Sequence, residues 1–183
     1  AQELAQLLHF ASRPALDIRG LGDKIAEQLI QRGLVHEWAD LYQLSPGDFL
    51  SLEGFADISA NKLHHEIQAH RKVPLDRFIY ALGIRHVGSQ TANDIAKRVG
   101  SIKAFLELEQ ESLFQIDGIG EVVAQSILDF LHDKRERNKV ERLLKEVEVQ
   151  SFERQTNLPL SGTSWVITGT LDSLGREEAK DKI

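Results

Sequence analysis

Four copies of a seven-residue phrase, each ending in a glycine-rich turn or a close variant of one, hold the residues of this sequence best suited to bind an anion. The copies occupy residues 16–22, 50–56, 82–88 and 114–120. Their fifth residues, at positions 20, 54, 86 and 118, recur every 32 to 34 residues. A tight turn that opens a helix presents unpaired amide N–H groups, which together with the helix dipole favour a phosphate oxygen. The phrases therefore predict four candidate phosphate-binding turns.

The first and third copies carry the positive charge. The first has both glycines, with Arg19 before the turn and Lys24 just after it, and is expected to be the strongest site. The third lacks the first glycine, but Arg85 and His86 make its turn the most basic, and it ranks second. Glycine suits such a turn because it can take a left-handed conformation and lets a phosphate approach the backbone closely.

The second and fourth copies are acidic. The fourth keeps both glycines but places them between Asp117 and Glu121. The second has Ala56 where the second glycine would be, between Glu53 and Asp57, and is expected to be the weakest site. It stays open whether these two copies contact a ligand at all or only brace their partners, because each pair needs both halves to bury its apolar faces.

The expected partner is double-stranded DNA, held by its backbone. Amide donors read no base, so binding should not depend on sequence, and two turns can hold both strands across a minor groove. The residues expected to contact DNA are Arg19, Gly20, Leu21, Gly22, Lys24, Gly54, Arg85, His86, Val87, Gly88, Gly118, Ile119 and Gly120.

A repeated packing frame positions these turns. Four residues after each phrase comes an alanine, and three further on an aliphatic residue; these are Ala26, Ala60, Ala92 and Ala124, with Leu29, Leu63, Ile95 and Ile127. This spacing indicates a helix after each turn, packed closely on the helix before it. Repeats of this period are stacked supersecondary units. We therefore predict an all-α fold of four helix-hairpin-helix motifs, which a break at Val73-Pro74 divides into two pairs.

The ends of the chain complete this organisation. Residues 2–12 and 133–147 show helical apolar spacing. We expect a helix-hairpin-helix DNA-binding domain over 1–149 and a polar linker over 150–159. The stretch 160–183 contains one strand candidate and one helix start, which predicts the truncated beginning of an α/β domain.

Composition limits the possible functions. The net charge is −6 and the pI about 5.7, which argues against a broad Lys/Arg surface, although backbone dipoles need little net charge to hold phosphate. There is no cysteine and no apolar run long enough to cross a membrane. No secretory leader is visible either, so we expect a cytoplasmic protein without membrane partners.

Two rival hypotheses concern single residues. His64, His65 and His70 form the densest histidine group, but their spacing matches no common zinc pattern. Lys24 is placed like the nucleophile of hairpin-containing DNA glycosylases, with Asp40 as the nearest candidate for the aspartate that those enzymes need. Neither is favoured, so no catalytic, cofactor-binding or metal-binding residue is expected in this chain.

The chain resembles the C-terminal part of bacterial NAD-dependent DNA ligases over nearly its whole length. The resemblance is carried by residues 9–13, 17–22, 52–55, 81–88 and 116–121. The tail, in residues 160–162, 166–171 and 176–179, resembles the first strand and helix of that family's BRCT domain. Ala56 departs from the family's usual glycine, which puts a phosphate contact by the second turn in doubt.

The resemblance implies a fragment of a bacterial, nucleoid-associated enzyme that seals nicks in replication and repair. Upstream zinc and adenylation domains of the same chain would hold zinc, magnesium and NAD, and this part would clamp nicked duplex DNA without catalysing anything itself. The alternatives are the DNA-structure-binding helix-hairpin-helix region of another repair protein, of the excision-nuclease type, and a protein-interaction scaffold.

Overall fold

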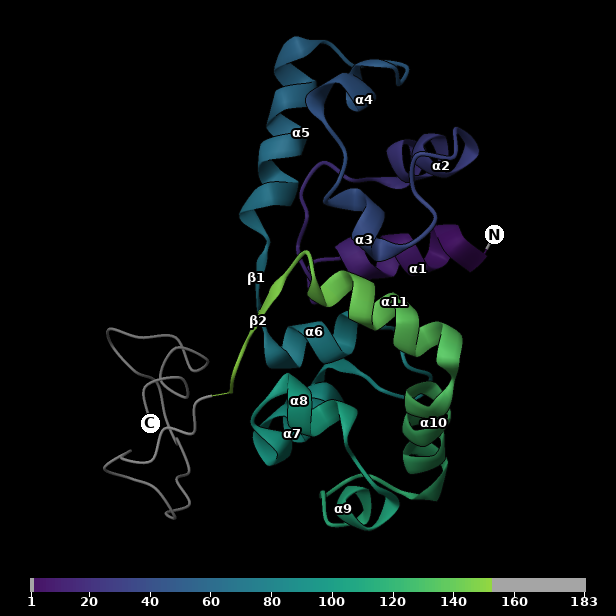
Figure 1. Ribbon diagram of the computed structural model, residues 1–183, viewed down its shortest axis with the longest axis vertical. Helices are drawn as coiled ribbons and strands as arrows, with labels where there is room; N and C mark the ends of the chain where they lie inside the picture. Colours follow the sequence, from purple (N-terminus) through teal and green to yellow (C-terminus); the bar gives the residue numbers. More distant parts are fainter. Residues whose placement is uncertain (1, 153–183) are drawn as a thin grey trace, which may run out of the picture. The chain divides into compact units, whose positions relative to one another are not determined.

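The computed structural model describes residues 2–152, and within them the chain forms eleven helices and two short strands (Figure 1). The helices are α1 (Gln2–Ala11), α2 (Asp23–Gln31), α3 (Trp38–Leu41), α4 (Pro46–Leu50), α5 (Asp57–Ala69), α6 (Leu75–Ala81), α7 (Ser89–Val99), α8 (Ile102–Leu106), α9 (Gln110–Phe114), α10 (Glu121–His132) and α11 (Lys134–Leu144). The strands are β1 (Lys72–Pro74) and β2 (Glu148–Gln150).

Each phrase forms the turn in front of a long helix, as predicted. We call these turns hairpins 1 to 4; they precede α2, α5, α7 and α10. Hairpins 2, 3 and 4 follow directly on α4, α6 and α9, whereas an irregular stretch separates α1 from hairpin 1. A residue with a side-chain oxygen opens each of the four long helices; these are Asp23, Asp57, Ser89 and Glu121. Three of them are acidic and so face the positive end of the helix dipole.

The repeated frame fills the core. The four alanines that follow the phrases are at most 1% exposed, and the aliphatic residue after each of them is at most 4% exposed. The small side chains of the four alanines let the helices of each hairpin approach closely. Around this frame lie the fully buried rings of Phe10, Phe49, Phe78 and Phe105. Burying one such side chain contributes about 1.5–3 kcal/mol, so the aromatic rings anchor the repeats.

The hairpins form two pairs along the long axis of this unit. In Figure 1, α4 and the start of α5 lie at one end, α9 and the start of α10 lie at the other, and α2 and α6 lie between them. Hairpins 1 and 2 therefore belong to one half and hairpins 3 and 4 to the other.

A two-stranded parallel sheet joins the halves and corrects the sequence analysis twice. Val73 pairs with Val149, and Pro74 with Gln150, so the fold is not purely α-helical. The linker was expected to begin at residue 150, but Gln150 lies in β2, and the amide of Phe152 donates to the carbonyl oxygen of Gly100 at 2.9 Å. The compact unit runs to Phe152. The rest of the expected linker and the expected BRCT start at 160–183 lie outside the described residues.

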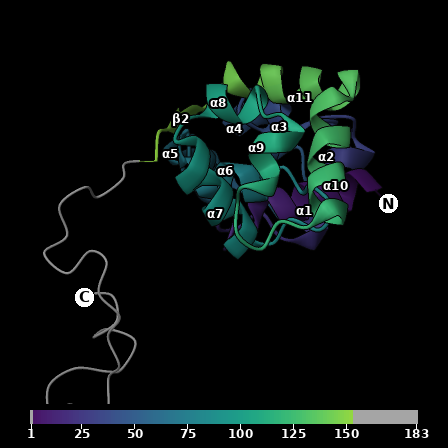
Figure 2. The same cartoon turned by 90° about the horizontal axis from the view of Figure 1, so that it is seen from below.

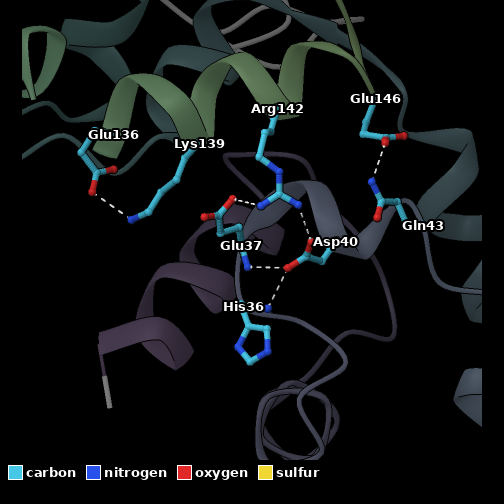
Figure 3. A network of polar contacts seen from close by, with 8 residues as sticks. All are labelled: His36, Glu37, Asp40, Gln43, Glu136, Lys139, Arg142 and Glu146. Atoms are coloured by element: carbon cyan, nitrogen blue, oxygen red, sulfur yellow. Dashed lines mark hydrogen bonds and ion pairs between the residues drawn. The ribbon is translucent and has the colours of Figure 1, made fainter. Parts of the chain in front are cut away.

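Helix α11 ties the second half back to the first. It follows hairpin 4 in the chain yet packs beside α3, and Figure 2 shows it running along one side of the helical unit. Arg142 on α11 donates to Glu37 and, at 3.0 Å, to Asp40 (Figure 3). Burial alone would raise the pKa of Asp40. The amides of His36 and Glu37 and the guanidinium of Arg142 outweigh that effect and hold the pKa below its ordinary value.

A second set of contacts lies just beyond α11. The carboxylate of Glu146 accepts from Gln43 at 3.0 Å and from Arg71 at 3.1 Å, and these bonds lower its pKa. The guanidinium of Arg71 also lies 5.2 Å from the centre of the Tyr42 ring. It donates to the backbone carbonyl oxygen of Tyr42 at 3.0 Å. Burial raises the pKa of the Tyr42 hydroxyl. Together these bonds fix the two hairpin pairs relative to each other.

Candidate DNA-backbone interface

The fifth residue of every phrase has the same backbone conformation, including the one that is not glycine. The φ angles are +91° at Gly20, +85° at Gly54, +82° at Gly118 and +65° at His86. Residues other than glycine rarely adopt this left-handed backbone conformation, because it costs them roughly 1 kcal/mol or more. The sequence suggested that hairpin 3 departs from the pattern because it lacks the glycine; the structure shows that its turn is the same and that His86 accepts the strain.

The second residue of the phrase separates the hairpins into two kinds. Its φ is +52° at Asp17 and +66° at Gly83, in hairpins 1 and 3. In hairpins 2 and 4 it is −72° at Ser51 and −83° at Gln115. At this residue hairpins 1 and 3 therefore share one backbone conformation, and hairpins 2 and 4 share another.

The seventh residue caps the long helix and is glycine in three of the four hairpins. Gly22, Gly88 and Gly120 have φ between −83° and −91° and ψ of 177° or 178°, which any residue can adopt. A Cβ built on any of them would meet no atom of the described residues within 4 Å. Neither backbone strain nor internal packing therefore requires glycine here. What remains is the space that these glycines leave in front of the helix, open to a group from outside.

The amides at this point are free in three hairpins and engaged in one. No bond to the amides of Gly22, Gly88 or Gly120 is formed by any described residue. In hairpin 2 the amide of Ala56 donates to Ser59 Oγ at 2.9 Å. Hairpin 2 therefore has neither the glycine nor a free amide at the seventh phrase position. Its rank as the weakest site stays a prediction, for which the bonded amide supplies a reason that the spacing alone did not suggest.

The sixth residue of the phrase faces inward, which narrows the predicted interface. Leu21, Val87 and Ile119 are at most 7% exposed. Their amides donate to the carbonyl oxygens of the third phrase residues, at 3.4 Å to Ile18, 3.1 Å to Ile84 and 3.1 Å to Ile116. These three residues shape the turn but offer neither a free donor nor an exposed side chain. The donors that remain belong to the seventh residue and to the first turn of the helix.

The predicted basic residues lie on the surface around hairpins 1 and 3. The side chain of Arg19 is 82% exposed and lies 3.7 Å from the carboxylate of Asp17, and the backbone amide of Arg19 donates to Glu66 Oε1 at 3.3 Å. Lys24, Arg85 and His86 are exposed too. Gly54 and Gly118 are exposed in hairpins that carry no cation within the phrase. The structure thus places basic side chains beside free amides in hairpins 1 and 3.

A groove between hairpins 1 and 2 adds a residue that the phrases did not indicate. It encloses about 560 Å³ and is lined by residues of both turns and of α5, among them Arg19, Gly54 and Lys62. Lys62 lies outside the repeated phrase, so the sequence offered no signal for it. With Arg19 it gives this groove two cationic side chains.

The rival hypotheses find little support in the geometry. Among residues 2–152 no group of three or more histidine, aspartate or glutamate side chains is gathered as a metal site would require. His70 instead bonds through Nδ1 to the carbonyl oxygen of Glu66 at 2.7 Å. Asp40, the candidate partner of Lys24, is committed to Arg142 and to two backbone amides.

No helix among the described residues is long and apolar enough to cross a membrane.

Two family models match the chain, and both describe helix-hairpin-helix structure. The model described as SAM-like Helix-hairpin-helix tandem covers residues 12–69, which include hairpins 1 and 2. The model described as Helix-hairpin-helix motif covers residues 77–140, which include hairpins 3 and 4. The predicted motif type and its occurrence in two pairs are therefore confirmed.

Curated relatives match over nearly the whole chain. Proteins named DNA ligase are 47% identical in Chloroflexus aggregans, over 98% of this chain, and 40% identical in Saccharophagus degradans, over 100% of it. A DNA ligase of Cellvibrio japonicus is 38% identical over 98%. The chain spans only 27% of the length of each of these relatives.

Proposed function

We propose, from the premise that this chain is a helix-hairpin-helix segment of the bacterial DNA ligase family, that it binds the backbone of nicked duplex DNA independently of sequence. Hairpins 1 and 3 provide the main phosphate contacts. Their free amides donate to the phosphate oxygens, and the exposed cations beside them add charge-assisted bonds. Hairpin 4 has free amides but acidic neighbours, and hairpin 2 contributes no amide from its capping residue.

The observation that carries this proposal is the set of glycines at the seventh phrase position. Gly22, Gly88 and Gly120 are needed neither for their φ angles nor for internal packing. They matter only if another molecule comes close to the backbone there. A phosphate fits, because the donors at a helix N-terminus and the dipole both favour an anion. The acidic net charge is compatible with this mode, since the donors are backbone groups.

The place of this segment in a complete enzyme is part of the same proposal. It would hold the duplex while an NAD-dependent adenylation domain of the same chain seals the nick, in cytoplasmic replication and repair. NAD, zinc and magnesium would be held by other parts of such an enzyme. The described residues do not gather ligands for zinc, because the chain has no cysteine and these residues form no cluster of three or more carboxylates or histidines. The start of a BRCT domain at 160–183 likewise stays a prediction.

Titration of the chain with labelled DNA at several salt concentrations tests this proposal. Nicked, intact and single-stranded DNA are compared by fluorescence anisotropy. Because amides supply much of the contact, we expect log K to fall with log salt by a slope equivalent to about two to four released ions, rather than the roughly ten of a strongly basic binder. Tightest binding is expected for the nicked duplex. Absence of binding at low salt would contradict the proposal and favour a protein-interaction scaffold.

The part of the proposal that concerns ligation needs its own test. A longer protein that joins this chain to upstream zinc and adenylation domains of a relative should seal nicks with NAD, and deletion of residues 1–152 from it should reduce sealing. Sealing that is unaffected by the deletion would show that this segment does not hold the substrate.

A further inference from the structure

Large apolar side chains reach the surface at equivalent places in hairpins 2 and 4. Among residues 2–152, those classed as exposed are Leu50, Ile58, Phe114 and Val122. Leu50 and Phe114 are the first phrase residues of these hairpins, 42% and 47% exposed. Ile58 and Val122 are the second residues of α5 and α10, 85% and 65% exposed. Two positions that coincide in two hairpins are a pattern rather than scattered surface residues.

Hairpins 1 and 3 do not share this pattern, so the motif itself does not require it. Their first phrase residues, Leu16 and Leu82, are buried, at 4% and 3% exposed. At the second helical position they carry the polar Lys24 and Gln90. The apolar surface is therefore specific to the two hairpins whose second phrase residue has a negative φ.

The charge of hairpins 2 and 4 is unsuited to phosphate. No lysine or arginine occurs in residues 50–58 or 114–122, and each stretch contains two carboxylates. In hairpin 2 the capping amide is also occupied by Ser59. Surfaces of this kind should seek uncharged, C–H-rich parts of a ligand rather than its anionic groups.

The two surfaces lie at equivalent places beside the capping residues of hairpins 2 and 4. Val122 is two residues after Gly120, whose amide is free, and Ile58 is two residues after Ala56, which caps α5 at the equivalent place. Hairpins 2 and 4 lie toward opposite ends of the unit, beyond α2 and α6 (Figure 1). A duplex that is bound at hairpins 1 and 3 and continues along this axis would carry its deoxyribose rings, between phosphates, toward both ends of the unit.

We propose that Ile58 and Val122 pack against deoxyribose rings on the minor-groove side of the duplex, so that hairpins 1 and 3 bind phosphate and hairpins 2 and 4 bind sugar. This inference rests on the proposed DNA-binding function and deepens it. Methyl groups in contact with sugar carbons remove apolar surface from water without reading a base. They also release no counterions, which separates them from the basic contacts in an experiment.

The test is the double variant Ile58→Ser/Val122→Ser of the full chain, titrated with nicked duplex at a series of salt concentrations. We expect its affinity to fall about tenfold at every salt concentration, with the slope of log K against log salt unchanged. Arg19→Ala should instead reduce the slope by about one. Gln31→Ser, an exposed glutamine at the opposite end of α2 from hairpin 1, is the control and should change neither quantity.

Folding is monitored separately. Both side chains are exposed, so the thermal midpoint of the double variant should equal that of the wild type. The corresponding double alanine variant, which keeps higher helix propensity, should give the same loss of affinity.

Three outcomes would overturn the inference. Unchanged DNA affinity would mean that hairpins 2 and 4 brace their partners or serve another protein. A changed salt slope would place the effect on phosphate contacts. Self-association of the wild type in ultracentrifugation that the double variant loses would identify a second copy as the occupant. Failure of the wild type to bind DNA at all would be a different result, because it contradicts the proposed function itself.

Discussion

Arg142 donates to Asp40 across 3.0 Å, although 102 residues separate them in the chain. The bond joins α11, which follows hairpin 4, to α3, which lies between hairpins 1 and 2 (Figure 3). Since hairpins 1 and 3, where we propose the phosphate contacts, belong to different halves, their separation depends on contacts of this kind. The ion pairs around α11 therefore help to set the spacing at which two strands of DNA could be held.

Arg142→Ala should weaken the protein in a pH-dependent way. The pKa of Asp40 is lowered in the folded state, so its contribution is fully present above the ordinary carboxylate pKa of about 4 and is lost as pH falls through the lower, folded value. Without Arg142 the folded pKa rises. We expect a loss of about 1 kcal/mol in the free energy of unfolding at pH 7, discounted for the partial exposure of Arg142, and a shallower decline between pH 5 and about pH 2.

Urea unfolding monitored by circular dichroism across this pH range measures the effect. Arg135→Ala, an exposed arginine on the same helix, is the control and should behave as the wild type. Identical pH profiles for Arg142→Ala and the wild type would show that the ion pair contributes nothing to acid stability.

Gly22→Asp should reduce DNA affinity more than Ala56→Asp. At Gly22 the new carboxylate blocks a free amide and repels phosphate, which should cost about tenfold or more in affinity. At Ala56 the amide is already bonded to Ser59, so the loss should be smaller. The free energy of unfolding should change by no more than about 0.5 kcal/mol in Gly22→Asp, because a Cβ there meets open space. Equal losses of affinity would refute the ranking of the hairpins.

His86→Gly should stabilise the fold. His86 has a φ of +65°, so glycine relieves strain and should raise the free energy of unfolding by about 0.5–1 kcal/mol. The reciprocal change, Gly20→Ala at a φ of +91°, should lower it by about 1 kcal/mol or more. Chemical denaturation of both variants checks the pair, and a destabilised His86→Gly variant would mean that contacts of the imidazole outweigh the strain.

Ala92→Leu should be among the more damaging conservative changes in the frame. Ala92 is 0% exposed where α7 packs in its hairpin, and extra methylenes in such a site cost typically about 1–3 kcal/mol. Ala69→Leu, exposed at the end of α5, should stay within about 0.5 kcal/mol of the wild type. Differential scanning calorimetry of the two variants makes the comparison. Similar thermal midpoints would show that the alanines do not set the helix spacing.

The packing frame could be predicted because its signals are local. The buried alanines and aliphatics recur at fixed offsets from each phrase, and the helix starts follow from the residues that open them. The strands could not be predicted in this way. Val73 stands before a proline, which indicated a break, and its pairing with Val149 depends on how distant segments are brought together.

The site was predicted less completely, because the chemistry of an amide depends on what else it bonds to. Glycine spacing located the turns. It did not show that Ser59 engages the amide of Ala56, or that the amide of Val87 bonds within its own turn. Nor did it show that His86 keeps the conformation of a glycine. These features come from hydrogen bonds and backbone angles that residue type alone leaves undecided.

The positive φ shared by Asp17 and Gly83 also bears on how such a protein can be enlarged. Because the second phrase residue has a positive φ in hairpins 1 and 3 and a negative φ in hairpins 2 and 4, the module that repeats is a pair of unlike hairpins. A designer who wished to lengthen the array would have to insert such pairs. A single inserted hairpin would break the alternation of the two hairpin types along the rest of the array.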